Sequence, residues 1–210
     1  VLGVFSYRSF SARMLSIKQP VGMSIQDLPV DEFMEDLEFV HISDDPASAF
    51  DLLDRDDAVL VGQPGHLQGI LTAIDVLRRL YRIASPFVLL AEIELTLRSL
   101  MAICIGEGEL EACVRNGLAG HYQEEQMPLQ FEEMTFNDYV QIVGHGRNWA
   151  RFEPVFGNGE WKRKRTRAKL VQVRDLRNDA FHFKRTLTEK DRNTLLAHRD
   201  WLFRTARRVE

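Results

Sequence analysis

The sequence predicts an α+β protein in which a small mixed module precedes an all-helical bundle. Two short apolar runs, Ala58–Val61 and Leu67–Leu71, flank a turn built on Pro64-Gly65, which is the pattern of a β-hairpin. Strand patterns stop near Ser85-Pro86, and the rest of the chain follows helical periodicity. Neither half contains a low-complexity tract or an internal repeat.

The expected module covers residues 24–84, after an N-terminal extension over residues 1–23, and contains a βαββα unit. Ser24, Asp45 before Pro46, and Thr72 mark helix starts, because hydroxyl and carboxylate side chains cap the first free amides of a helix. The predicted elements are a helix over 24–38, a strand over 39–42, a helix from Pro46 onward, strands over 58–61 and 67–71, and a helix from Thr72.

The helical half is expected over residues 86–210. A long apolar helix opens it, and glycines at 144, 146, 157 and 159 mark the breaks between later helices. The predicted helices cover residues 87–105, 109–118, 135–152, 167–182 and 188–208. Helices with one apolar face bury it against one another, so this half is predicted to be a bundle.

Charge is distributed unevenly along the 210 residues. The net charge is −4, yet residues 145–210 carry 18 basic and 8 acidic side chains, a net of +10. This pattern is expected of a protein whose basic face meets a polyanion such as RNA. The alternative is internal: the acidic stretch 86–144, with a net of −8, would fold against the basic C-terminal third.

The remaining bulk properties limit the class of protein. No apolar run approaches the ~20 residues needed to cross a bilayer, and the first residues lack the basic-then-apolar pattern of a signal peptide. Cys104 and Cys113 are too few for a disulfide framework or a zinc site, and the histidines show no metal-site spacing. We expect a cytoplasmic protein with reduced thiols, no membrane partner, no metal and no required cofactor.

The segment Arg177-Asn178-Asp179-Ala180-Phe181-His182 combines a permanent cation, an amide and the one side-chain type that titrates near neutral pH. Asn178 and His182 stand at i and i+4 and share one face of the predicted helix. Cleavage of RNA through its own 2′-hydroxyl needs proton transfer and a cation for the charge that builds on the phosphoryl oxygens. His182 can transfer the proton, Arg177 can bind phosphate through its planar fork, and Asn178 can orient the imidazole.

A dense basic run precedes this motif along the chain. Its six cations, within eight positions, are Lys162, Arg163, Lys164, Arg165, Arg167 and Lys169. A cluster of this density attracts phosphates without regard to base sequence, so we predict that it binds RNA. Two alternatives remain open. The run could be a solvated helix face. His182 could be a structural interface histidine, with Arg177 paired to Asp175, to Asp179 or to an acid of the first bundle helix.

In the N-terminal module, residues 42–50, 58–61 and 69–77 resemble the CBS motif, named for cystathionine β-synthase. In that family a Thr/Ser-x-x-Asp sequence after the last strand binds an adenine nucleotide, the hydroxyl meeting a phosphate and the carboxylate meeting the ribose. The resemblance implies these roles for Thr72 and Asp75, with AMP, ADP or ATP as the possible ligand. The same two side chains also suit a capping box at the start of the helix, with no ligand.

The helical half, through Arg177, Asn178 and His182, resembles the HEPN family (higher eukaryotes and prokaryotes nucleotide-binding). Its members are helical bundles, and many are metal-independent endoribonucleases with an Arg-x4-His motif and a polar residue after the arginine. The resemblance covers residues 86–210 and implies catalytic roles for the three side chains.

Both halves lead us to expect a homodimer. CBS motifs work in pairs, and residues 1–39 contain no second complete motif, so another copy of the chain would cover the apolar sheet face. Strand scission needs a base and an acid, which two copies of His182 meeting at a two-fold axis would supply.

The expected function is therefore an adenine-nucleotide-responsive, metal-independent endoribonuclease that acts as a homodimer, as a toxin or in defence. One alternative is a non-catalytic nucleotide-binding regulator whose helical half only dimerises. Another is the helical partner of a nucleotidyltransferase in a toxin–antitoxin pair.

Overall fold

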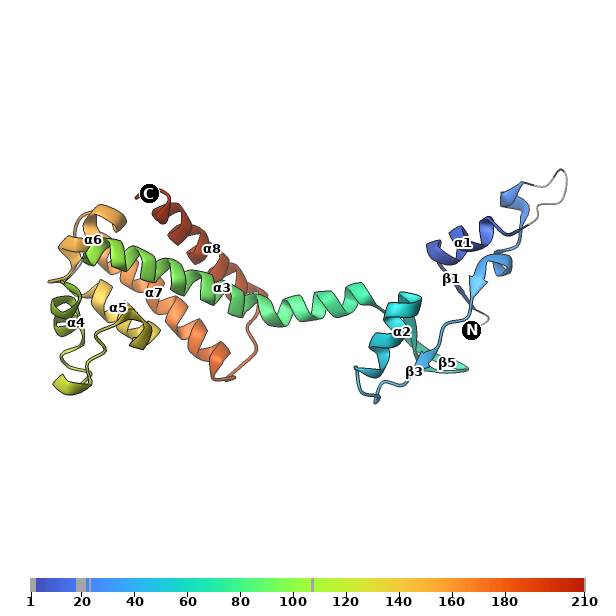
Figure 1. Cartoon of the computed structure of the whole chain (residues 1–210), viewed down its shortest axis with the longest axis horizontal. Coiled ribbons are helices and arrows are strands. Elements are labelled where there is room, and N and C mark those ends of the chain that lie inside the picture. Colours follow the sequence, from blue (N-terminus) through green and yellow to red (C-terminus); the bar gives the residue numbers. More distant parts are fainter. Residues whose placement is uncertain (1–2, 18–21, 23, 107, 210) are drawn as a thin grey trace. The chain divides into compact units, whose positions relative to one another are not determined.

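The computed structural model describes residues 3–17, 22, 24–106 and 108–209 of a mixed α+β chain. The chain divides into two compact units, residues 1–81 and 82–210 (Figure 1). Strands are found in the first unit, and the described part of the second unit is helical. No helix of the described residues is both long enough and apolar enough to span a membrane.

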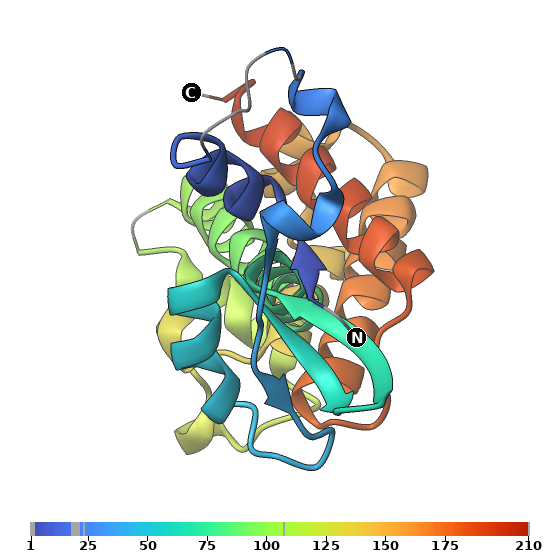
Figure 2. The ribbon, with the colours of Figure 1, turned by 90° about the vertical axis from the view of Figure 1, so that its right-hand side faces the viewer.

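A three-stranded sheet forms the centre of the first unit. Strand β3 (Phe39–Val40) runs parallel to β4 (Ala58–Gln63), and β4 pairs antiparallel with β5 (His66–Thr72). Helix α2 (Ser48–Asp56) packs against β4, and Figure 2 shows this helix next to the hairpin of β4 and β5. At Gly62 the register shifts, the φ angle is +127°, and an added Cβ would lie 2.4 Å from the carbonyl oxygen of His66. Glycine is therefore required at this bulge.

The core of this module is small. Ala49 and Leu53 of α2 are buried against Val59 of β4. In contrast, Ile70 of β5 and Ile74 at the start of the next helix are about half exposed. Exposure of these two apolar side chains to water is unfavourable, and covering them with another apolar surface would stabilise the module.

The segment before the sheet differs from the sequence prediction. The helix predicted over residues 24–38 is wrong: two short 3-10 turns, η1 (Ile25–Asp27) and η2 (Val30–Phe33), precede β2 (Met34–Glu35). Pro29, which has no amide hydrogen, separates the two turns in extended conformation. The predicted N-terminal extension contributes β1 (Val4–Phe5), which pairs with β2, and α1 (Tyr7–Met14).

Six helices and two short 3-10 turns are formed by the described residues after β5. They are α3 (Ala73–Ile105), α4 (Leu110–Leu118), η3 (Glu124–Gln126), η4 (Phe131–Glu133), α5 (Phe136–Gly144), α6 (Trp149–Phe156), α7 (Glu160–Phe181) and α8 (Glu189–Ala206).

Three predicted helix boundaries are wrong. The break predicted at Ser85-Pro86 is absent, and α3 continues through Pro86. Proline removes one backbone bond there, while Leu89 and Leu90, which are buried directly after it, favour continuation. The helix predicted over 135–152 is two helices separated by the turn 145–148. Helix α7 begins at Glu160 rather than 167, because lysine and arginine are good helix formers.

One continuous apolar core joins the helices of the second unit. It includes Leu97 of α3, Tyr139 of α5, Phe152 of α6, Val173 of α7 and Leu202 of α8, each fully buried. Cys113 is buried and Cys104 half-buried, both are free, and burial raises the pKa of the Cys104 thiol to about 11.

Asn148 stabilises the turn between α5 and α6. Its side chain is 1% exposed, and its amide nitrogen donates hydrogen bonds to the carbonyl oxygens of Cys113 (2.9 Å) and Ile142 (3.0 Å). Its amide oxygen accepts a hydrogen bond from Asn116 at 2.9 Å. One buried polar side chain therefore connects the backbones of α4 and α5 at the start of α6.

We predict that Asn148→Ala lowers the free energy of unfolding of the second unit by about 2 kcal/mol or more, because three hydrogen bonds of a buried side chain are lost. Asn158→Ala, in an exposed turn, is the matched control and should change it by less than about 0.5 kcal/mol. Urea unfolding followed by tryptophan emission measures this unit, since Trp149, Trp161 and Trp201 all lie within it. Equal midpoints for the two variants would contradict the assigned role.

Candidate functional site

The predicted catalytic motif lies at the C-terminal end of α7. The helix ends at Phe181, one residue earlier than predicted, and His182 is its C-cap. The backbone N–H of His182 donates to the carbonyl oxygen of Asn178 at 3.2 Å, so His182 still follows Asn178 by one helical turn. The His182 side chain is exposed, and among the described residues its ring makes no hydrogen bond or ion pair. The imidazole is therefore open to solvent and to ligands.

The residue after His182 has an unusual backbone. Phe183 has φ +51°, its N–H donates to Ala180 O (3.3 Å), and the Lys184 N–H donates to Asp179 O (3.0 Å). This is the Schellman arrangement, in which glycine normally occupies the left-handed position. A phenylalanine there costs about 1 kcal/mol or more, and its ring is 85% exposed. Phe183 therefore combines a strained backbone with a solvent-exposed aromatic ring directly beside His182.

Arg177 is half-buried and held by its neighbours. Its Nε lies 3.8 Å from Glu94 Oε2, and its guanidinium carbon lies 5.0 Å from the centre of the Phe181 ring. The partner is an acid of α3, one of the pairings that the sequence left open for a structural role. The Arg177 side chain is still partly exposed, so the ion pair with Glu94 can also orient the guanidinium toward a bound phosphate.

A chain of polar contacts continues from Glu94 into the core. The Arg98 guanidinium donates to Glu94 Oε1 at 2.6 Å and to the Tyr139 hydroxyl at 2.7 Å. That hydroxyl donates to the carbonyl oxygen of Phe131 at 2.6 Å, and burial raises the pKa of Tyr139. Because the phenol stays protonated and paired, Glu94 and Arg177 are connected to a rigid part of the bundle.

The six cations of the basic run take two different directions. Arg163 and Lys164 pair with Glu160 at 2.5 Å and 3.6 Å, and Arg163 also donates to Gly144 O. The stem of Arg167 packs over Gly144, where an added Cβ would lie 2.6 Å from its Cδ. These three face α5 or their own helix. The other three face α8.

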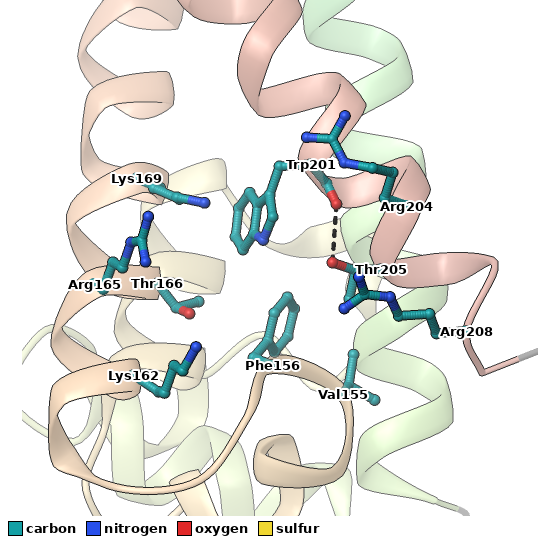
Figure 3. A pocket seen from close by; sticks show the side chains of 10 residues that line it. All are labelled: Val155, Phe156, Lys162, Arg165, Thr166, Lys169, Trp201, Arg204, Thr205 and Arg208. Carbon is teal, nitrogen blue, oxygen red and sulfur yellow. Dashed lines mark hydrogen bonds between the residues drawn. The ribbon is translucent and has the colours of Figure 1, made fainter.

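The side of α7 that faces α8 borders a pocket of about 250 Å³ (Figure 3). Five cations line it: Lys162, Arg165, Lys169, Arg204 and Arg208. Trp201 of α8 and Phe156 of α6 form its aromatic wall. Trp201, Arg204 and Thr205 of α8 are absent from the sequence prediction, although they stand at i, i+3 and i+4 and so share one helix face. Arg208 lies two residues beyond the end of α8.

Thr72 and Asp75 are brought together at the start of α3. The Thr72 hydroxyl donates to Asp75 Oδ2 at 2.6 Å, and the Asp75 backbone N–H donates to the hydroxyl at 3.3 Å. The hydrogen bond from the Thr72 side chain lowers the pKa of Asp75, with a smaller effect of Arg78. The capping box, which was the alternative to ligand binding, is therefore formed. The second carboxylate oxygen of Asp75, Oδ1, lies 3.9 Å from the guanidinium of Arg78.

Comparison of the chain with family models, with characterised proteins and with solved structures gave no significant match. Within the described ranges, no three His, Cys, Asp or Glu side chains form a group that could hold a metal ion. The candidate site therefore comprises an exposed imidazole, a half-buried arginine that pairs with Glu94, and a separate cationic pocket between α7 and α8.

His198 of α8 is a buried histidine whose protonation should destabilise the bundle at acidic pH. Its side chain is 8% exposed, Nε2 lies 2.9 Å from Gln172 Oε1, and burial, with a smaller contribution from Lys169, lowers its pKa to about 4. An unfolded histidine titrates near 6.5. Because the folded pKa is depressed, the unfolded chain binds the proton first as the pH falls, and stability is lost from about pH 6.5 downward toward pH 4.

We predict that the free energy of unfolding falls by about 2 kcal/mol between pH 7.5 and pH 5 because of this one group. His198→Gln keeps a donor for Gln172 but cannot titrate, so its decline over the same range should be smaller by that amount. His182→Gln, which replaces an exposed histidine, is the control and should follow the wild type. Urea titrations at each pH provide the measurement, and parallel curves for wild type and His198→Gln would show that His198 is not the group responsible.

Proposed function

We propose that the protein is a homodimeric, metal-independent endoribonuclease of the HEPN type that responds to an adenine nucleotide. The observation that carries the proposal is the end of α7, where the solvent-open imidazole of His182 stands one turn beyond Asn178. Arg177 on the same turn is anchored through Glu94. These are the groups that phosphodiester cleavage requires, at the spacing of the Arg-x4-His motif.

The proposed reaction uses the RNA as its own nucleophile. A base removes the proton of the 2′-hydroxyl, the 2′-oxygen attacks phosphorus, and the bond to the 5′-oxygen breaks. An acid then protonates the leaving 5′-oxygen, which leaves a 2′,3′-cyclic phosphate and a 5′-hydroxyl. Arg177 would neutralise the charge that develops on the non-bridging oxygens, and Asn178 would orient the imidazole or bind one of those oxygens.

A two-fold axis beside His182 would supply both the base and the acid. Exposed apolar side chains next to this residue support an interface there: Phe181, whose ring lies 5.3 Å from that of Phe87, and Phe183. Val88, adjacent to Phe87, is also exposed. In the first unit, the exposed Ile70 and Ile74 offer a second face that another copy could cover.

We expect His182→Ala to reduce RNA cleavage by about 10²- to 10⁴-fold, the range for loss of a positioned acid or base. His121→Ala, at another exposed histidine, is the matched control and should retain the wild-type rate. The measurement is cleavage of a labelled RNA in EDTA, with products identified by their 2′,3′-cyclic phosphate ends. A substrate with 2′-deoxy sugars should remain intact. Cleavage of the deoxy substrate, or full activity of His182→Ala, would falsify the mechanism.

The dimer gives a separate prediction. Wild type should sediment at about twice the chain mass of 24.3 kDa. Phe183→Asp places a charge in the proposed interface and should raise the dissociation constant by about tenfold or more. Leu129→Asp, a half-exposed apolar residue of the same unit, controls for a charge added elsewhere. Sedimentation velocity over a range of concentrations measures both, and equal behaviour of the two variants would exclude Phe183 from the interface.

Nucleotide response rests on Thr72 and Asp75 at the N-terminus of α3, where free amides favour phosphate. The ligand would have to bind two dimer states with different affinities in order to change the cleavage rate. We expect AMP or ATP to alter the rate in the wild type but not in Asp75→Asn. Identical wild-type rates with and without saturating nucleotide would remove this part of the proposal and leave the nuclease itself untouched.

The Arg177–Glu94 ion pair favours one alternative. If that pair is purely structural, the helical half only dimerises, and the chain is a non-catalytic nucleotide-binding regulator or the helical partner of a nucleotidyltransferase in a toxin–antitoxin pair. A dimeric wild type without RNA cleavage would support this alternative over the nuclease.

A further inference from the structure

The inward-facing stripe of α7 changes character halfway along the helix. Positions spaced by three or four residues hold Val173, Leu176 and Ala180 toward the C-terminus, and all three are buried in the core. The same stripe holds Lys162, Thr166 and Lys169 toward the N-terminus. Polar and charged residues at positions that face another helix are unfavourable unless they bind something. The pocket of about 250 Å³ lies at this polar half (Figure 3).

The cations of this pocket are not neutralised by the protein. None of its lining residues is acidic, and no ion pair joins Lys162, Arg165, Lys169, Arg204 or Arg208 to a carboxylate among the described residues. Elsewhere on the same two helices Arg163, Arg174 and Arg199 do pair with acids. Burial, together with the charges of Arg165, Arg204 and Lys162, lowers the pKa of Lys169. Bound anions would remove this mutual repulsion.

Neutral groups complete the pocket. Thr166 and Thr205 are 4% and 6% exposed; the Thr205 hydroxyl donates to Trp201 O at 2.9 Å and keeps its lone pairs available as acceptors. Lys169 Nζ lies 4.0 Å from the centre of the Trp201 ring, which fixes the ammonium on the pocket side. The walls thus come from three helices and combine two buried hydroxyl groups with aromatic rings, while Arg165, Arg204 and Arg208 are exposed.

We propose that this pocket between α7 and α8 binds a 5′-oligophosphate group, the two or three consecutive phosphates that end a nucleoside polyphosphate or an unprocessed RNA.

Charge and size favour an oligophosphate over a single phosphate. A phosphomonoester carries roughly −1.5 to −2 charges near neutral pH and would leave about three of the five cations uncompensated. A volume of about 250 Å³ lies below the ~300–1,000 Å³ of sites that enclose a drug-sized ligand. The phosphates would therefore occupy the pocket while the attached nucleoside remains outside. Free nucleotides and RNA 5′ ends both carry this oligophosphate group, and binding experiments distinguish these two sources.

Lys169 and His182 are 13 positions apart, which is roughly 20 Å along the helix axis. The pocket therefore does not contact the atoms that react at His182, and its occupancy does not depend on cleavage. If the protein is the proposed nuclease, an RNA end held in this pocket would select substrates by their 5′ terminus.

The test is isothermal titration of the full chain with inorganic triphosphate and, separately, with inorganic phosphate. Triphosphate should bind at least about tenfold more tightly than phosphate. The double variant Arg165→Gln/Arg204→Gln should lose about tenfold or more in triphosphate affinity. Arg147→Gln/Arg207→Gln removes the same charge from exposed positions of the same unit and should change it less than about twofold. Lys169→Met is a second pocket variant, and tryptophan emission in urea checks that each variant is folded.

The source of the oligophosphate is distinguished by three ligands: ATP, an RNA with a 5′-triphosphate, and the same RNA with a 5′-hydroxyl. Preference for the triphosphorylated RNA, lost in the pocket variants, assigns the pocket to RNA ends, whereas ATP binding of equal strength assigns it to free nucleotides. Equal binding of phosphate and triphosphate, or equal losses in the pocket and control variants, overturns the proposal. Because His182→Ala should bind triphosphate normally, failure of the nuclease and failure of the pocket are separate results.

Discussion

Burial of one face of α7 is the constraint on which the helical unit depends. Leu170, Val173, Leu176 and Ala180 lie in the common core, and each larger side chain contributes about 1.5 to 3 kcal/mol on burial. The Arg177–Glu94 ion pair, partly exposed, contributes at most about 1 kcal/mol. The apolar stripe and not the ion pair therefore sets the rotation of the helix. His182, nine residues after Val173, is turned about 180° away from the core and so faces solvent.

The same rotation explains how one run of charge serves two purposes. Of the α7 cations that do not face α8, Arg163 and Lys164 pair with Glu160, whereas Arg167 packs its stem on Gly144. Acids of α3 pair with Arg177 and Arg199 of the basic third, so part of the charge division is internal complementarity. The cations that face α8 have no such partners among the described residues, and they alone form a pocket. The net charge of the segment could not distinguish the cations that face α5 from those that face α8, because this depends on which side of α7 each side chain occupies.

Local signals in the sequence predicted the sheet and most helices. The hairpin followed from Pro64-Gly65 between apolar runs, and the capping box of Thr72 and Asp75, one of the two roles expected of them, is formed. The errors arose where tertiary packing overrides local preference. Pro86 does not end α3, because the residues after it are buried. The segment 24–38 has helical composition, but Pro29 and pairing of β2 with β1 prevent a helix.

The candidate site was predictable only in part. The spacing of Arg177, Asn178 and His182 could be read from the sequence, whereas the contacts of Arg177 with Glu94 and of Arg98 with Tyr139 join residues 41 or more positions apart. The pocket itself could not be predicted, because α6, α7 and α8 all contribute to its lining. Its cations are separated by up to 46 positions, between Lys162 and Arg208, and only the fold brings them together.

The central claim is that imidazoles from two subunits form one cleavage site. Mixed dimers measure this directly: wild type and His182→Ala are combined in varying ratios, allowed to exchange subunits fully, and assayed for RNA cleavage. A shared site requires both imidazoles, so activity should fall with the square of the wild-type fraction. Activity in simple proportion to that fraction would mean that each subunit acts alone, which contradicts the account.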